Sequence, residues 1–189
     1  EVIGAMICIA VTAIFGVELS AGGPVFPLIL AAVSGIMIYI SLDELLPTAE
    51  KDGKVNTMTA SWGGLGILWG KPVATAYIRP QRYTKEFVDA NEVFTLSFFD
   101  GECMKEMGYL GKVSGRDEDK IAKTGMHVTF VDGYPTFEEA HQVLVCRKMY
   151  QDEIKPENFL DKEQDGKWYP EKDYHTFYIA EIIAAYTQE

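Results

Sequence analysis

The chain has 189 residues, of which 48% are apolar and 24% charged, with eight prolines, and this composition excludes collagen-like, low-complexity and disordered proteins. Its net charge of −11 argues against a general nucleic-acid-binding protein, because such proteins carry a basic surface. The length suits one substantial domain plus an appendage. The three cysteines, Cys8, Cys103 and Cys146, show neither CxxC spacing nor even pairing, so we expect a reduced, cytoplasmic setting without a disulfide framework.

Charge divides the chain near residue 50. Residues 1–50 contain five acidic residues and no Lys or Arg, and within them residues 2–17 and 19–42 lack any charge. We expect an N-terminal hairpin of two hydrophobic helices. Residues 27–46 would rise about 30 Å as a helix, the thickness of a bilayer's hydrocarbon, whereas the first run is only marginally long enough. A helical hairpin buried in a soluble core is the alternative, although neither run shows the polar stripe of a surface helix.

Residues 35–47 (GIMIYISLDELLP) resemble a late transmembrane helix of ZIP-type metal transporters, and residues 1–16 resemble the helix before it. This resemblance covers two helices of such a transporter and implies membrane association through residues 1–46. Lys51 and Lys54 then place the rest of the chain on the cytoplasmic side. The family's metal-carrying His and Glu motifs lie in earlier helices, and this chain has no histidine before His127. We therefore expect neither metal transport by this chain alone nor a metal site.

A basic stretch follows the hydrophobic runs. Residues 53–85 contain no acidic residue and five basic ones, which marks a candidate anion site. Within it, residues 55–62 alternate hydroxyl and apolar side chains, so we expect a strand with Thr57, Thr59 and Ser61 on one face. Residues 63–66 (GGLG) predict a turn or bulge, and they do not match the GxGxxG fingerprint.

Residues 72–78 predict a second strand, at whose end Arg79, Arg82 and Thr84 suit a phosphate. Thr84 alternatively caps a short helix over residues 85–90. Further along, residues 142–150 predict a strand in which Cys146 is a small buried side chain. Residues 155–160 predict a short helix, and residues 161–173 form a charged loop that either covers a ligand or a partner subunit or is a solvated connection.

Five sequence blocks in this polar part resemble the flavin reductase-like family, whose fold is an FMN-binding split β-barrel. They are, in family order, residues 56–64 (NTMTASWGG), 78–84 (IRPQRYT), 94–98 (FTLSF), 114–120 (SGRDEDK) and 173–182 (DYHTFYIAEI). The resemblance implies a mainly β domain over residues 54–189 with short helices, FMN as its ligand, NAD(P)H or a protein as electron donor, and a homodimer. Residues 1–50 form the other predicted part.

The resemblance also implies roles for individual residues. The flavin ring and ribityl chain would lie against Asn56, Thr57, Thr59, Ala60, Ser61 and Trp62, and the phosphate would lie against Arg79, Arg82, Tyr83 and Thr84. His175 matches the family's histidine near the flavin, where a reductant approaches, and is our candidate catalytic residue. The block from Ser114 to Lys120 is expected at the flavin or at a partner subunit. Its alternative is a helix capped by Ser114 or Asp117 and ended by Gly125.

The sequence departs from the family before residue 56. Family members have a segment there that includes an early barrel strand, whereas here the transporter-like runs take its place and the join falls within residues 48–53. We therefore expect a barrel short of one strand, with unpaired edges. Either the chain is an anchored reductase, or it is a composite of two genes. Its function is predicted as FMN-dependent electron transfer, with an electron carrier that lacks reductase turnover, or a non-functional composite, as alternatives.

Overall fold

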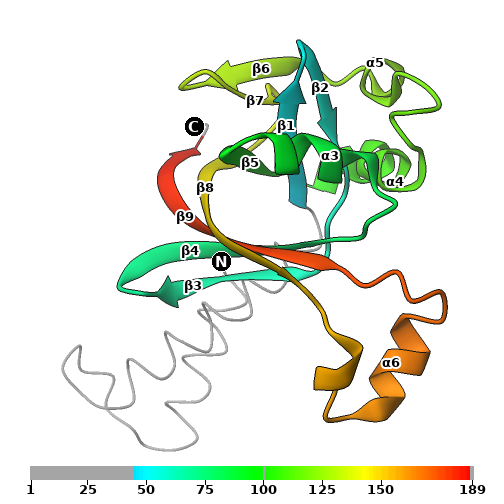
Figure 1. Ribbon diagram of the computed structural model, residues 1–189. Helices are drawn as coiled ribbons and strands as arrows, with labels where there is room; N and C mark the ends of the chain where they lie inside the picture. Colours follow the sequence, from blue (N-terminus) through cyan, green and yellow to red (C-terminus); the bar gives the residue numbers. More distant parts are fainter. Residues whose placement is uncertain (1–44, 100, 188–189) are drawn as a thin grey trace, which may run out of the picture. The chain divides into compact units, whose positions relative to one another are not determined.

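The computed structural model describes residues 45–99 and 101–187, which form an antiparallel β domain with short helices (Figure 1). Its elements in chain order are β1 (Leu45–Lys51), β2 (Lys54–Thr57), β3 (Gly63–Leu68), β4 (Lys71–Ile78), α3 (Tyr83–Ala90), β5 (Val93–Phe98), the 3₁₀ turn η1 (Gly101–Cys103), α4 (Met104–Lys112), α5 (Lys120–Thr124), β6 (Val128–Val131), β7 (Tyr134–Phe137), β8 (Gln142–Glu153), the 3₁₀ turn η2 (Pro156–Asn158), α6 (Lys162–Trp168) and β9 (Thr176–Thr187).

In the described residues the main sheet has seven strands in the order β2-β1-β5-β8-β9-β4-β3, and β6 and β7 form a separate hairpin. The chain passes from the β2 edge to the β3 edge through residues 58–62, which we call the crossing segment. The mainly β prediction is therefore confirmed. The expected helical hairpin lies outside the described residues, and within residues 45–99 and 101–187 no helix meets the length and hydropathy needed to cross a membrane.

The barrel's early strand is present, contrary to the expectation that the transporter-like segment replaces it. Leu45–Lys51 forms β1, which pairs with β5 through residues 45–48 and with β2 through residues 48–51. Pro47 has a register partner only on the β5 side, so its missing N–H breaks no ladder bond to β2. The expected join is a tight hairpin turn, because Asp52 (φ 53°) and Gly53 (φ 74°) both adopt the left-handed conformation.

The predicted strand over residues 55–62 is wrong in its second half. β2 ends at Thr57, and the chain then leaves that edge of the sheet as the crossing segment. The predicted turn over residues 63–66 is also wrong, because these glycines belong to β3, where Gly63 lies opposite Ala76. A Cβ on Gly63 would lie 2.4 Å from the Thr75 carbonyl oxygen, so this glycine permits a close backbone approach between two strands.

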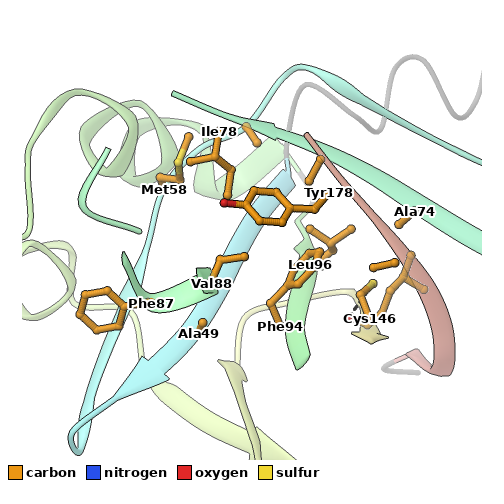
Figure 2. Close-up of a cluster of buried hydrophobic side chains, with 14 of the residues drawn as sticks. Ala49, Met58, Ala74, Ile78, Phe87, Val88, Phe94, Leu96, Cys146 and Tyr178 are labelled. Carbon is orange, nitrogen blue, oxygen red and sulfur yellow. Dashed lines mark hydrogen bonds between the residues drawn. The ribbon is translucent and has the colours of Figure 1, made fainter. Parts of the chain in front are cut away.

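A cluster of buried apolar side chains forms the main hydrophobic core (Figure 2). It joins β1, β4, β5, β8, β9 and α3, and Tyr178 and Phe94 are among its largest fully buried members. α3 contributes Phe87 and Val88, which pack this helix into the core. Cys146 is buried as expected, and burial raises the pKa of its thiol to about 12, which keeps it protonated.

The short helices differ from their predictions in detail. α3 begins at Tyr83 without a side-chain cap, so Thr84 is not its cap. α5 is capped by Asp119, whose Oδ1 accepts from the Ala122 N–H, rather than by Ser114 or Asp117, and it ends at Gly125 as expected. The predicted helix over residues 155–160 is only the turn η2, and the predicted loop over residues 161–173 contains α6.

β1 should contribute directly to stability, because Leu46 is fully buried against a second apolar cluster that includes Met107 and Leu110 of α4. We predict that Leu46→Ala lowers the free energy of unfolding by about 2–5 kcal/mol, the usual cost of such a cavity. Urea denaturation followed by tryptophan fluorescence would measure it. Leu160→Ala is the control, since Leu160 is fully exposed. Equal stability of the two variants would contradict the placement of β1 in the core.

Candidate functional site

Two adjoining hollows form one groove, which lies beside the crossing segment. The larger, of about 410 Å³, is the cation end and is lined by Met58, Arg79, Gln81, Arg82, Tyr83, Thr84, Lys112, Val113, Ser114, Gly115 and Lys120. The smaller, of about 220 Å³, is the aromatic end and is lined by Met58, Thr59, Ala60, Ser61, Trp62, Tyr77, Arg79, Arg82, Trp168 and His175. Met58, Arg79 and Arg82 line both hollows, so the groove is continuous.

The fold brings these residues together from five places in the sequence. β4 ends just before Arg79, and α3 begins just after Arg82. The loop after α4 and the first residue of α5 supply the far wall of the cation end. The end of α6 and the residue before β9 supply Trp168 and His175 at the aromatic end. Because strand ends and helix starts converge here, the sheet and the core hold the site in place.

Four cationic side chains and no acidic one line the cation end: Arg79, Arg82, Lys112 and Lys120. Lys120 is 4% exposed and donates to the carbonyl oxygens of Leu110 (2.8 Å) and Val113 (3.1 Å). Burial, and then the charge of Arg82, lower its pKa to about 8. Burial and the charge of Arg79 likewise lower the pKa of Arg82. Crowded, partly desolvated cations of this kind are stabilised by an anion.

At the cation end, Asn56 and Thr84 form a buried polar pair. The Asn56 Nδ2 donates to the Thr84 Oγ1 at 2.9 Å, and both side chains are at most 2% exposed. Gly115 packs against Asn56, since a Cβ there would lie 2.3 Å from the Asn56 Oδ1. Asn56 therefore supports the wall of the groove and is absent from its lining, while Thr84 both lines the groove and accepts this bond.

The expected row of three hydroxyls does not form. Thr57 is fully buried under β1, where its Oγ1 donates to the Pro47 carbonyl oxygen at 3.0 Å. Thr59 lines the groove, but its Oγ1 donates to the Met107 carbonyl oxygen. Ser61 lines the aromatic end and is exposed. The physical reason is that the chain leaves the β2 edge after Thr57, so side chains beyond it no longer alternate across one sheet.

At the aromatic end, Trp62 stacks on His175 with ring centroids 4.6 Å apart and planes 29° apart, and Trp168 meets Trp62 edge-on at 5.3 Å. His175 is 7% exposed, and its Nδ1 lies 2.8 Å from the Tyr169 hydroxyl. Burial, followed by the charge of Arg79, lowers the His175 pKa to about 4. His175 is therefore neutral at pH 7, beside an aromatic wall that suits a planar ring.

The structure thus places most of the sequence-predicted site residues on one groove. Those that line it are Thr59, Ala60, Ser61, Trp62, Arg79, Arg82, Tyr83, Thr84, Ser114, Lys120 and His175. Sequence reasoning missed Gln81, Lys112 and Trp168. Gln81 lies inside the 78–84 block, and Lys112 stands two residues before the Ser114 block. Trp168 ends α6, within the residues 161–173 that were expected either to cover a ligand or partner subunit or to form a solvated loop.

A family model described as "Flavin reductase like domain" matches residues 45–189, so the chain belongs to this family, and its first matched residue coincides with the start of β1. Solved structures share the fold. The flavoredoxin of Methanosarcina acetivorans is 25% identical (TM-score 0.60; 77% of this chain and 68% of that chain). An FMN-binding protein of Thermus thermophilus is 20% identical (TM-score 0.60; 77% and 71%). The styrene monooxygenase flavin reductase of Pseudomonas putida S12 is 18% identical (TM-score 0.55; 77% and 78%).

The N-terminal segment matches zinc transporters named ZupT, as its resemblance to ZIP-type proteins predicted. It is 74% identical over 31 residues to that of Chlorobium phaeovibrioides, which is 16% of this chain and 12% of the transporter. The match to the transporter of Chlorobium luteolum is 67% over 45 residues, or 23% and 17%. The chain therefore spans less than a fifth of the length of these relatives.

Because His175 is neutral when folded, stability should fall as the pH drops. Its pKa is about 4 in the fold against the ordinary histidine value of 6.5, so between these two pH values the unfolded chain binds the extra proton. We predict that wild type loses about 3 kcal/mol relative to His175→Gln as the pH falls from 6.5 to 4. Urea unfolding of both proteins at several pH values would measure this. A constant difference across that range would contradict a buried, neutral His175.

Proposed function

We propose that this chain binds FMN in the groove, with the phosphate at the cation end and the flavin ring at the aromatic end. The observation that carries the proposal is that the two ends of the groove differ in chemistry, one cationic and the other aromatic. Four cationic side chains and no acidic one line one end, and Trp62, Trp168 and His175 line the other. FMN has a matching arrangement, since it carries an anionic phosphate at one end and a planar aromatic ring at the other. FMN is also the cofactor expected from the sequence, and membership of the flavin reductase like family supports it.

The donor set fits each part of FMN. Arg82, Lys112 and Lys120 would hold the phosphate, because guanidinium and ammonium groups form charge-assisted hydrogen bonds to its oxygens. Trp62 would pack against the ring, and Ser61 supplies a hydroxyl beside it. When bound, the flavin supplies the hydride chemistry, and the protein contributes position and electrostatics. His175 would meet the ring or an approaching reductant as a neutral side chain.

On this basis we propose an oxidoreductase that passes electrons between NAD(P)H, or a protein donor, and flavin. An electron carrier without reductase turnover is the second candidate, which the similarity to two flavoredoxins, at 25% and 23% identity, favours. The homodimer expected from the sequence stays a prediction. We assign no transport function to the chain, because the matched segment is a small part of each zinc transporter.

A titration with FMN and with riboflavin, which lacks the phosphate, tests the placement of the ligand. We predict that Arg82→Ala weakens FMN binding by about 1.5–3 kcal/mol, the usual worth of a charge-assisted hydrogen bond, and leaves riboflavin binding nearly unchanged. Flavin fluorescence would report both affinities. Arg147→Ala is the control, because Arg147 is an exposed cation on β8 that does not line the groove. An equal loss for both flavins would place the phosphate elsewhere.

Anaerobic mixing of the purified chain with FMN and either NADH or NADPH separates reductase from carrier. For a reductase we predict loss of the oxidised-flavin absorbance at about 450 nm with one of the two donors. The matched control is FMN with the donor but without protein. Stable FMN binding without bleaching by either donor would favour the electron carrier, and absence of FMN binding would contradict both.

A further inference from the structure

Tyr169 and His175 form a buried pair next to the aromatic end. Tyr169 directly follows α6 and is 2% exposed, and His175 directly precedes β9 and is 7% exposed. The Tyr169 hydroxyl lies 2.8 Å from the His175 Nδ1. Tyr169 does not line the groove, whereas His175 does. The tyrosine therefore acts on a ligand there only through neighbours that line the groove, which are His175 through this hydrogen bond and Arg79, which lies 5.3 Å from the centroid of its ring.

The direction of this hydrogen bond follows from what the two buried groups require. In the described residues the His175 Nδ1 is the hydrogen-bond partner of the buried Tyr169 hydroxyl, and a buried O–H needs an acceptor for its proton. Burial raises the pKa of Tyr169, so the hydroxyl keeps its own proton. If Nδ1 instead donated to the tyrosine oxygen, the buried O–H proton would be left without an acceptor, so the hydroxyl donates to the Nδ1 of His175. The imidazole then carries its proton on Nε2.

Neighbouring groups keep the imidazole neutral and its plane fixed. Trp62 stacks on one face at 4.6 Å. The charges of Arg79, beyond β4, and Arg82, before α3, oppose protonation of His175, while that of Asp173 favours it. Desolvation by burial is the largest influence and also opposes protonation. One ring nitrogen is thus held by Tyr169, one face is covered by Trp62, and Nε2 is the nitrogen left for a ligand.

We propose that Tyr169 is a positioning residue that holds His175 as its neutral Nε2–H tautomer, so that the aromatic end presents a fixed N–H donor to a carbonyl oxygen or ring nitrogen of a bound heteroaromatic ring. Its role toward FMN or a nicotinamide rests on the function proposed above. The tautomer itself is a property of the protein without ligand. Both parts can therefore be tested separately.

Nitrogen-15 NMR of the ligand-free chain, labelled at its three histidines, tests the tautomer directly. Comparison with His175→Gln identifies the His175 signals. At pH 7 we expect the Nε2–H pattern for wild type, and in Tyr169→Phe a shift of the two ring-nitrogen signals toward one another as the second tautomer becomes populated. An Nδ1–H pattern in wild type would overturn the proposal without any tyrosine variant, as would an unchanged tautomer in a folded Tyr169→Phe.

Tyr174→Phe is the matched control. Its ring lies 4.9 Å from that of Tyr169, but its hydroxyl donates to Asp165 at 2.7 Å, away from His175. We expect its His175 signals to match wild type. In FMN titrations, Tyr169→Phe should retain phosphate-dependent binding while its flavin reduction slows, a change in kcat rather than in affinity. If His175 is the Nε2–H tautomer but the chain does not bind FMN, only the proposed function is contradicted. If the chain binds FMN but His175 is the Nδ1–H tautomer, only this inference is contradicted.

Discussion

The arrangement of the groove depends on Arg79, which joins the sheet to the segment that carries the aromatic end. Its guanidinium forms an ion pair with Asp173, donates to the Trp168 carbonyl oxygen at 2.8 Å, and lies 5.3 Å from the centroid of the Tyr169 ring. Gln81 also donates to Asp173, at 2.7 Å. Because α6 has no buried side chain of its own, these polar contacts hold its end against the end of β4. Removing one partner of such a partly buried pair leaves the other charge uncompensated.

Arg79 also separates the chemistry of the two ends. Its charge is partly met by Asp173, so the excess positive charge of the cation end comes mainly from Arg82, Lys112 and Lys120. At the aromatic end the same arginine helps to keep His175 neutral. One residue therefore contributes to an anion site and to a neutral histidine, and both effects follow from its position at the end of β4.

Sequence reasoning found the charges of the site and most of its lining, because these depend on residue type and on family blocks. The strand over residues 72–78 and the buried Cys146 were equally predictable, since alternation and hydropathy decide them. Sequence reasoning failed where the chain leaves one strand partner in the sheet and pairs with another. Alternation over residues 55–62 carries no information on which sheet edge the chain follows, and a glycine such as Gly63 looks the same in a turn as in a close strand contact.

The boundary near residue 45 shows a similar limit. Leu45–Leu46–Pro47 continues an apolar run and suits the end of a helix, yet it begins β1 because β5, far along the chain, supplies its pairing partners. Long-range pairing of this kind overrides local preference. The importance of Tyr169 had no signal in the sequence, because its role depends on a hydrogen bond across the segment that leads to β9.

A crystal structure of the chain grown with FMN would test the central claim most directly. The account predicts the FMN phosphate within hydrogen-bond distance of Arg82 and Lys120, and the flavin ring beside Trp62 and His175. A phosphate at the aromatic end, or FMN bound outside the groove, would contradict it.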